Sequence, residues 1–254
     1  AGGATVDGAF NVTFTDDATW RAAITSITVG GTTLSGGYSI SAGQITFTPS
    51  ASNPSALLQS SGTKTIVVAA TGYANTSVNQ TIGVGAASKL GMSVQPTAPS
   101  SNGVALGTQP IVLIQDQYGN TTTSTATVVA SATSSLWNIG GTTSKTGVSG
   151  TATFTDLTAT NASSVTGATI TFTSTGLSSV TSSSFDIPSP ASVTIASASQ
   201  IAAGNIQKNT AKQALSAFTM AVTTANAVVS QIVFSTAGTY AASDVSKFQL
   251  WYST

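Results

Sequence analysis

The chain has 254 residues, with seven Lys and Arg, seven Asp, and no Glu, His or Cys. Without His or Cys it cannot build a His-activated nucleophile, a His or Cys metal site, or a thiol-based active site. Catalysis by paired carboxylates would depend on the scattered Asp residues. A net charge of zero and a single Arg, Arg21, argue against nucleic-acid binding, which needs a basic surface. The composition therefore predicts a protein that is not an enzyme and has no cofactor.

Hydroxyl side chains dominate the remaining composition, with 45 Thr and 38 Ser. Charged residues make up 6%, far below the roughly 25% of an ordinary soluble domain. The hydrophobic fraction of 41% is rich in strand-forming residues, which predicts a folded chain rather than a disordered one. Because the net charge is zero, repulsion between copies is weak, and this suits a protein that is anchored or assembled.

The hydropathy and the ends of the chain bear on its location. No run of about 18 apolar residues is present, so no membrane insertion is expected, and no signal peptide is recognisable. The chain begins at Ala1 without Met and stops at Thr254 inside a strand-like pattern. These features predict a mature or excised part of a longer polypeptide.

Strand patterns begin at Phe10, Val12 and Phe14, where apolar residues alternate with polar ones. Asp16 and Asp17 come next, just before Ala18, and this order predicts a helix cap and one short helix near residues 17–24. Alternation recurs at residues 38–40, 45–47, 78–82, 170–172, 218–222 and 248–252, with glycine-rich turns between several of these runs. Such short strands predict an all-β fold of tandem Ig-like β-sandwiches.

Two boundaries divide the chain into three expected domains, at residues 1–85, 86–188 and 189–254. Each boundary is an aliphatic strand followed by small residues or prolines and then a new strand. Such short linkers limit bending, so we expect the domains to form an extended rod. The third has only about 64 residues against the roughly 100 of an Ig-like sandwich, so it is expected to be incomplete. Either more of the same chain or a strand from a neighbouring copy would complete it, and the first is favoured because Ala1–Val6 has too few large apolar residues to act as a donor strand.

The N-terminal part carries several elements in a distinctive order. They are Phe14-Thr15-Asp16-Asp17-Ala18-Thr19-Trp20, residues 24–31, Tyr38-Ser39-Ile40, Ile45-Thr46-Phe47 and residues 65–75. Through them, residues 10–82 resemble the haemoglobin-interacting (DUF1533-type) domain of bacterial surface proteins. This family is widespread among surface proteins and the chain has no His to ligate haem, so haemoglobin binding does not follow from the resemblance.

Two further segments resemble Ig-like modules. Residues 88–187, through the stretches 109–120 and 150–157, resemble the Ig-like repeats of invasin/intimin-like adhesins. Within them, Ile111–Ile114 is expected to be a buried central strand, and Asp116–Asn120 its exit turn, with Gly119 and Asn120 supplying positive φ. Residues 193–254, through 238–245 and 247–252, resemble Ig-like segments of large Bacteroidota surface adhesins. The three resemblances together imply a modular bacterial cell-surface protein.

The carboxylates Asp16, Asp17 and Asp116 are the candidate Ca²⁺ ligands of the chain. A cap on the first helical turn explains Asp16 and Asp17 more simply. A turn held by Asx hydrogen bonds explains Asp116 together with Asn120. The favoured interpretation is therefore that no metal is bound.

The three Trp residues are the candidates for sugar stacking. Trp20 is expected to pack its helix on the sandwich, and Trp137 to lie in a core. Trp251 alternates out of phase with Phe248 and Tyr252, so these residues form a candidate interaction surface at the end of the chain.

The composition and the resemblances predict a non-enzymatic extracellular cell-surface protein that serves as an adhesin stalk or filament subunit. The alternatives are a carbohydrate-binding or spacer region of a large secreted enzyme, and a subunit of an S-layer or sheath. Expected partners are other domains of a longer polypeptide or neighbouring copies, through strand edges. Host or environmental glycans and proteins stay open as ligands, and no nucleic acid is expected.

Overall fold

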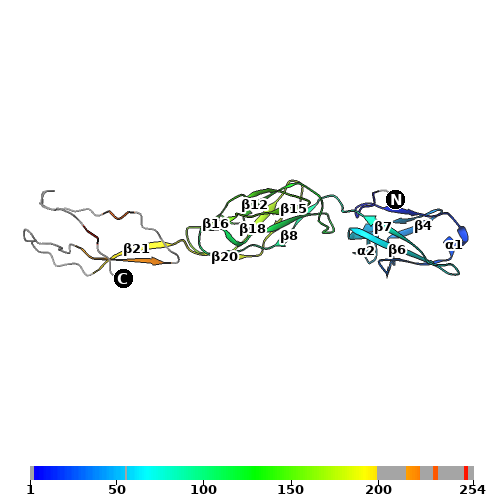
Figure 1. The fold of residues 1–254 in the computed structure, drawn as a ribbon, viewed down its shortest axis with the longest axis horizontal. Coiled ribbons are helices and arrows are strands. Elements are labelled where there is room, and N and C mark those ends of the chain that lie inside the picture. The colour runs from blue at the N-terminus through cyan, green and yellow to red at the C-terminus, as the bar shows by residue number, and fades with distance from the viewer. Residues whose placement is uncertain (1–2, 55, 199–215, 224–230, 234–248, 251–254) are drawn as a thin grey trace, which may run out of the picture. The chain divides into compact units, whose positions relative to one another are not determined.

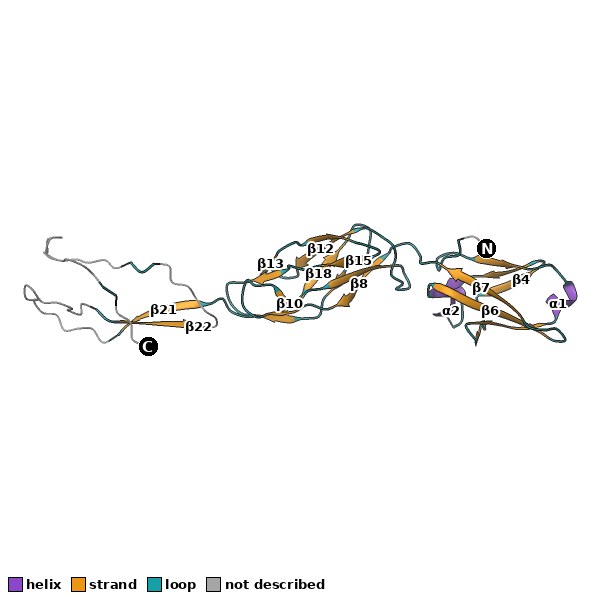
Figure 2. Ribbon diagram, viewed as in Figure 1, coloured by secondary structure: helices purple, strands orange, loops and turns teal. Residues whose placement is uncertain are grey.

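A computed structural model describes residues 3–54, 56–198, 216–223, 231–233 and 249–250 (Figure 1). Over these residues strands dominate and helices are short, which confirms the predicted all-β class (Figure 2). The chain divides into two compact units, Ala1–Pro190 and Ala191–Thr254. The first unit contains two separate hydrophobic cores. We call them the first core, built mainly from residues 4–82, and the second core, built from residues 87–187.

Two antiparallel sheets enclose the first core. One has the strand order β1 (Phe10–Thr13), β5 (Gln44–Phe47), β4 (Tyr38–Ser41), and the other has the order β3 (Thr32–Thr33), β2 (Ile24–Val29), β6 (Gly62–Ala70), β7 (Thr76–Ile82). Alternation decides which side chains face inward: Ile45 and Phe47 of β5 are buried, as are Ile66 and Val68 of β6. Phe10 stacks on Phe47 with ring centroids 5.3 Å apart. The predicted period-2 pattern therefore forms the core of a β-sandwich.

Short helices and an N-terminal segment complete this sandwich. The predicted helix is α1 (Ala18–Ala22), shorter than expected, and Trp20 anchors it by an edge-on contact with Phe14 at 5.0 Å. The 3-10 helix η1 (Pro49–Ala51) and the helix α2 (Ala56–Gln59) have no counterpart in the sequence-based expectations. Ala4 and Val6, which precede the first expected strand, are also buried in the first core.

The second core lies between another pair of sheets. One has the order β15 (Thr151–Thr153), β11 (Ile111–Gln115), β8 (Lys89–Val94), and the other β14 (Ser144–Thr146), β12 (Thr127–Ala132), β18 (Ile170–Thr173), β19 (Val180–Thr181). Smaller strand pairs are β9 (Thr97–Pro99) with β10 (Leu106–Thr108), β13 (Asn138–Gly140) with β16 (Thr158–Thr160), and β17 (Val165–Ala168) with β20 (Phe185–Ile187). β11 is central in its sheet, as expected, with Val112 and Ile114 fully buried.

In the second unit, the described strands are β21 (Ser192–Ser197) and β22 (Phe218–Thr223). They pair antiparallel from Ser192 opposite Thr223 to Ser197 opposite Phe218. β22 contains the alternation of Phe218, Met220 and Val222 that the sequence indicated. Of the strand expected at residues 248–252, the structure describes Gln249 and Leu250, which are not part of a strand, and the rest lies outside the described residues.

Candidate functional site

The first pair of candidate carboxylates lies at α1. Asp17 Oδ1 accepts hydrogen bonds from the backbone N–H groups of Thr19 (2.8 Å) and Trp20 (3.0 Å), so Asp17 caps the helix. Asp16 pairs with the guanidinium of Arg21 and accepts a hydrogen bond from the N–H of Gly43 at 3.1 Å. The hydrogen bond from Arg21 is the main reason why the pKa of Asp16 is lowered. Both side chains thus have structural partners within the chain.

The other candidate, Asp116, follows β11 directly and is completely buried. Its Oδ1 accepts hydrogen bonds from the N–H groups of Tyr118 (2.9 Å) and Asn120 (3.0 Å), which close the expected exit turn. Gly119, at φ 94°, supplies the positive φ of this turn. Asn120 is not among the residues with positive φ, so that part of the expectation is wrong. Asp116 Oδ2 accepts a hydrogen bond from Asn120 Nδ2 at 2.8 Å, which ties the turn to its own carboxylate.

Asp116 also binds the segment that connects the two cores. The N–H of Gly85 donates to Asp116 Oδ2 at 2.9 Å, and the next N–H, that of Ala86, donates to Asp7 Oδ2 at 2.6 Å. Asp7 Oδ1 accepts a further bond from Gln117 Nε2 at 2.9 Å. Two consecutive peptide N–H groups of the linker are therefore bonded to two carboxylates, one from the segment before the linker and one from the segment after it. We call the set Asp7, Gly85, Ala86, Asp116 and Gln117 the joint.

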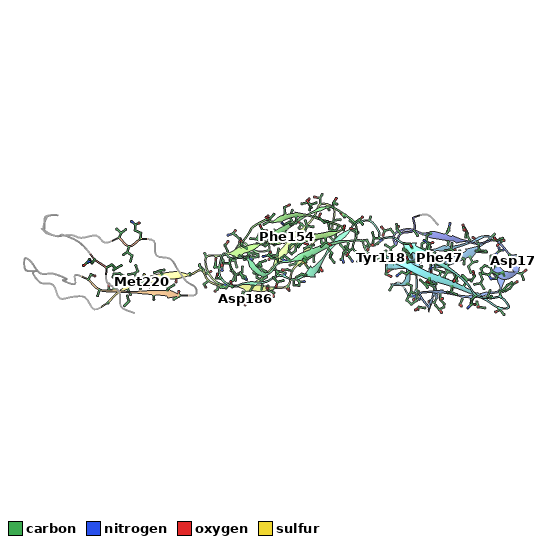
Figure 3. All side chains as sticks on the ribbon, in the orientation of Figure 1. Asp17, Phe47, Tyr118, Phe154, Asp186 and Met220 are labelled. Carbon is green, nitrogen blue, oxygen red and sulfur yellow. The ribbon has the colours of Figure 1, made fainter. Side chains whose placement is uncertain are left out.

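The turn after β11 also reaches the first core. Asn120 Oδ1 accepts a hydrogen bond from the N–H of Ser61 at 3.0 Å, and Asn120 Nδ2 donates to the C=O of Gln59 at 2.9 Å. Both partners lie at the end of α2 or just after it. Tyr118 packs against the first core although its sequence neighbours belong to the second (Figure 3). The turn after β11 is therefore attached to the first core by polar contacts of Asn120 and by the apolar contact of Tyr118.

Sequence reasoning singled out Asp116 and Asn120 but missed Asp7 and Gln117. Asp7 stands alone in a glycine-rich stretch, far in sequence from the turn that it meets. No local sequence pattern predicts a contact of this kind, because the groups come together only in the tertiary structure. The available signal is compositional: in a chain with seven Asp residues, each one is a candidate for a specific bond.

A side chain at residue 85 should occupy the space of the Asp7 carboxylate and weaken the joint. A Cβ atom on residue 85 would lie 2.3 Å from Asp7 Oδ1. We therefore expect Gly85→Ala to displace the Asp7 carboxylate and to break its bonds to Ala86 and Gln117, with a loss of about 1–2 kcal/mol in the free energy of unfolding. Amide hydrogen exchange should show faster exchange at Ala86. Gly83→Ala, whose Cβ meets its nearest atom at 3.4 Å, is the comparison variant; equal exchange at Ala86 in both variants would contradict the prediction.

The joint should also weaken in acid. Burial alone raises the pKa of Asp116, but the hydrogen bonds from Gly85, Asn120 and Tyr118 outweigh it, so the net pKa is lowered. A group with a lowered folded pKa contributes stability that is complete above its unfolded pKa of about 3.9, and that is lost as the pH falls through the folded pKa. At pH values below about 4, we expect the free energy of unfolding to decrease as the pH is lowered. In urea titrations at several pH values, Asp116→Asn should make this dependence on pH less steep. An unchanged slope in the variant would contradict this assignment.

The aromatic candidates separate into two groups. Trp137 is 1% exposed and makes an edge-on contact with Phe185 at 5.9 Å, so it lies in the second core and offers no sugar-stacking face. Trp20 packs on Phe14, as described above. Trp251, Phe248 and Tyr252 lie outside the described residues.

Two absences hold for the described part of the chain. No three His, Cys, Asp or Glu side chains come together there as a group that could hold a metal ion. No helix in the same part is long and apolar enough to cross a membrane.

The following solved structures are similar to this chain at low sequence identity. The D00-D0 domain of intimin aligns over 72% of this chain and 94% of its own length, at 12% identity and a TM-score of 0.42. The β-glucuronidase of Parabacteroides merdae aligns over 65% of this chain but 21% of its own length, at 13% identity and a TM-score of 0.28. This chain therefore corresponds to about a fifth of that enzyme. No curated protein matches the chain in sequence.

One family model does match, and it covers the part of the chain that encloses the first core. The matched residues are 1–83, and the family is described as the Hb-interacting domain of the heme-binding protein Shr-like. The match includes Ala4, Val6 and Asp7, which precede the segment where the sequence resemblance begins. The predicted resemblance of residues 10–82 to the haemoglobin-interacting domain is thus confirmed, and the match extends over residues 1–83.

Proposed function

We propose that this chain is a non-enzymatic part of an extracellular bacterial surface protein, and that its β-sandwiches serve as a stalk. The joint is the observation that carries this proposal. A linker whose N–H groups are bonded to both neighbouring modules resists bending, and a stalk needs this resistance to hold more distal domains away from the cell. The family match of residues 1–83 supports a surface location.

Small-angle X-ray scattering of the full chain tests the stalk. A compact protein of this length has a radius of gyration of about 18 Å, and a stalk should exceed that value clearly. The variant Asp7→Ala should show a broader distribution of interatomic distances than the wild type, because the bonds from Ala86 and Gln117 to the Asp7 carboxylate are lost. A radius of gyration near the compact value would refute the stalk.

The location is tested separately, on intact cells of the producing bacterium. Antibodies raised against the chain should label the cells without permeabilisation. Antibodies against a cytoplasmic protein, which should label permeabilised cells alone, are the control. Labelling that requires permeabilisation would refute the extracellular location and leave the scattering result untouched.

A second function, recognition of haemoglobin or another protein by residues 1–83, is favoured by the family match alone. Because the chain has no His, such binding would have to recognise the protein surface rather than ligate haem through an imidazole. Biolayer interferometry with immobilised haemoglobin, and with serum albumin as the control, tests it. Equal signals on both surfaces would rule out specific haemoglobin binding.

A further inference from the structure

β7 is the longest edge strand among the described strands of the first unit. It carries none of the features that usually protect a sheet edge: its sequence has no Lys, no Pro and no other charge, and its pairing with β6 runs without a bulge from Thr76 to Ile82. Other edges are shorter, such as β14, which also carries Lys145, or are already paired, such as β8, whose Leu90 donates to Ser178. β7 is therefore the least protected edge of this unit.

The free backbone groups of β7 can be identified. At its C-terminal end, Gly83 N–H donates to the C=O of Ala4 at 2.7 Å, and Gly83 C=O accepts from the N–H of Val6 at 3.1 Å, so Gly83 directs both groups away from β6. Because backbone direction alternates along a strand, Ser77 and Asn79 direct their N–H and C=O groups the same way. Thr65 of β6, which lies opposite Asn79, supports this assignment. The C=O of Thr65 accepts a hydrogen bond from the N–H of Gly30, on the side of β6 away from β7, so Thr65 and Asn79 do not bond each other through their main chains.

A groove with both polar and apolar lining runs beside this edge. Val78 lies on the same face of β7 as Gln80 and Ile82, which are both buried, yet Val78 itself is 41% exposed. The groove next to it is lined by Gly3, Ala4 and Thr5 of the N-terminal segment, by Val12 and Thr13 of β1, and by residues 78–81 and Gly83. The N-terminal segment is hydrogen-bonded to Gly83, whereas Val78 stays partly exposed.

We propose that β7 pairs with β7 of a second copy of this chain, antiparallel and centred on Val78. In this register Ser77 of each copy lies opposite Asn79 of the other, and the two residues exchange both main-chain hydrogen bonds. The two Val78 side chains meet on the core-facing side and cover the groove of each copy. The contact is isologous, so one patch supplies both halves.

A second copy is compatible with this edge in charge and in hydrogen bonding. β7 is uncharged and the whole chain has a net charge of zero, so two identical edges approach without repulsion. Its Ser, Thr and Asn side chains can each donate and accept hydrogen bonds, so the strand is compatible with itself. A single strand pair buries a small area, and we expect a weak dimer with a Kd of about 0.1–1 mM. The proposal does not depend on the stalk.

Cross-linking tests the register. The chain has no Cys, so Val78→Cys introduces a single thiol. Residues in a non-hydrogen-bonded antiparallel pair have Cα atoms about 4.5 Å apart, within the range that a disulfide spans. Val129→Cys is the matched control, since Val129 is also 41% exposed but lies in β12, between β14 and β18. Under mild oxidation, Val78→Cys should form dimers about tenfold faster than Val129→Cys; equal rates would overturn the proposal.

Sedimentation velocity of the full chain tests the association without a cross-link. The sedimentation coefficient should rise as the concentration increases from about 10 μM to 1 mM. Val78→Lys should abolish this rise by placing a charge at the edge, whereas Val129→Lys should keep it. Thermal unfolding of both variants shows whether each is folded. A wild type that stays monomeric, including one that binds extended peptides but not itself, would refute the proposal.

Discussion

Asp116→Ala is expected to lower the free energy of unfolding of the second core by about 3 kcal/mol or more. The buried carboxylate accepts hydrogen bonds from Tyr118, Asn120 and Gly85. Alanine would leave these donors without an acceptor in a site closed to water, and each unsatisfied buried donor costs about 1–3 kcal/mol. Urea unfolding, followed by the fluorescence of Trp137 in a background where Trp20 and Trp251 are Phe, measures the effect.

The comparison variant is Asp186→Ala. Asp186 is exposed and accepts a hydrogen bond from the N–H of Gly167 at 2.9 Å, so water can replace its carboxylate. We expect little change in stability there. If the two variants lost equal stability, the hydrogen bonds of Asp116 would not be the reason why this residue matters.

Gly150→Ala is expected to destabilise the second core by about 3 kcal/mol. Gly150 has φ 75°, and a Cβ there would lie 2.0 Å from the backbone oxygen of Thr122, a contact that a rotamer change cannot relieve. Its C=O accepts from Ile114 at 2.7 Å, so any shift would also disturb β11, directly before Asp116.

Gly176→Ala separates the clash from the backbone strain. Gly176 has nearly the same φ, 76°, but a Cβ there meets no atom within 4 Å. We expect a loss of about 1 kcal/mol, the cost of positive φ alone. Thermal unfolding of both variants gives the comparison. Similar losses would mean that strain, and not the close approach of Thr122, governs residue 150.

Much of the fold could be predicted because alternation reports burial directly. Phe10 and Phe47 fall on the inward face of regular strands, and Asp17 precedes α1 in the usual capping order. The helices at residues 49–51 and 56–59 could not be predicted in this way. They are a single turn each, too short for a helical period to develop, and packing of residues such as Leu58 holds them in place.

The candidate site could be predicted only where its residues are neighbours in sequence. The turn from Asp116 to Asn120 is a local pattern, and the structure contains it. The partners Asp7 and Gly85 come from distant segments, and tertiary structure alone brings them to Asp116. Alternation also does not tell an edge strand from a central one, so the exposed position of Val78 in β7 could not be predicted.

The joint makes the boundary at residues 85–86 unsuitable as a simple cut point for building chimeras. Asp7 belongs to the segment before the cut and Asp116 to the segment after it, yet each bonds an N–H group at the cut. A foreign module placed after Gly85 would bring no acceptor for the Gly85 N–H unless it carried its own buried carboxylate after the equivalent strand. A module placed before Ala86 would need a counterpart of Asp7 and a surface that accommodates Tyr118. Exchangeable cassettes from this chain should therefore be cut elsewhere, or should carry both carboxylates together.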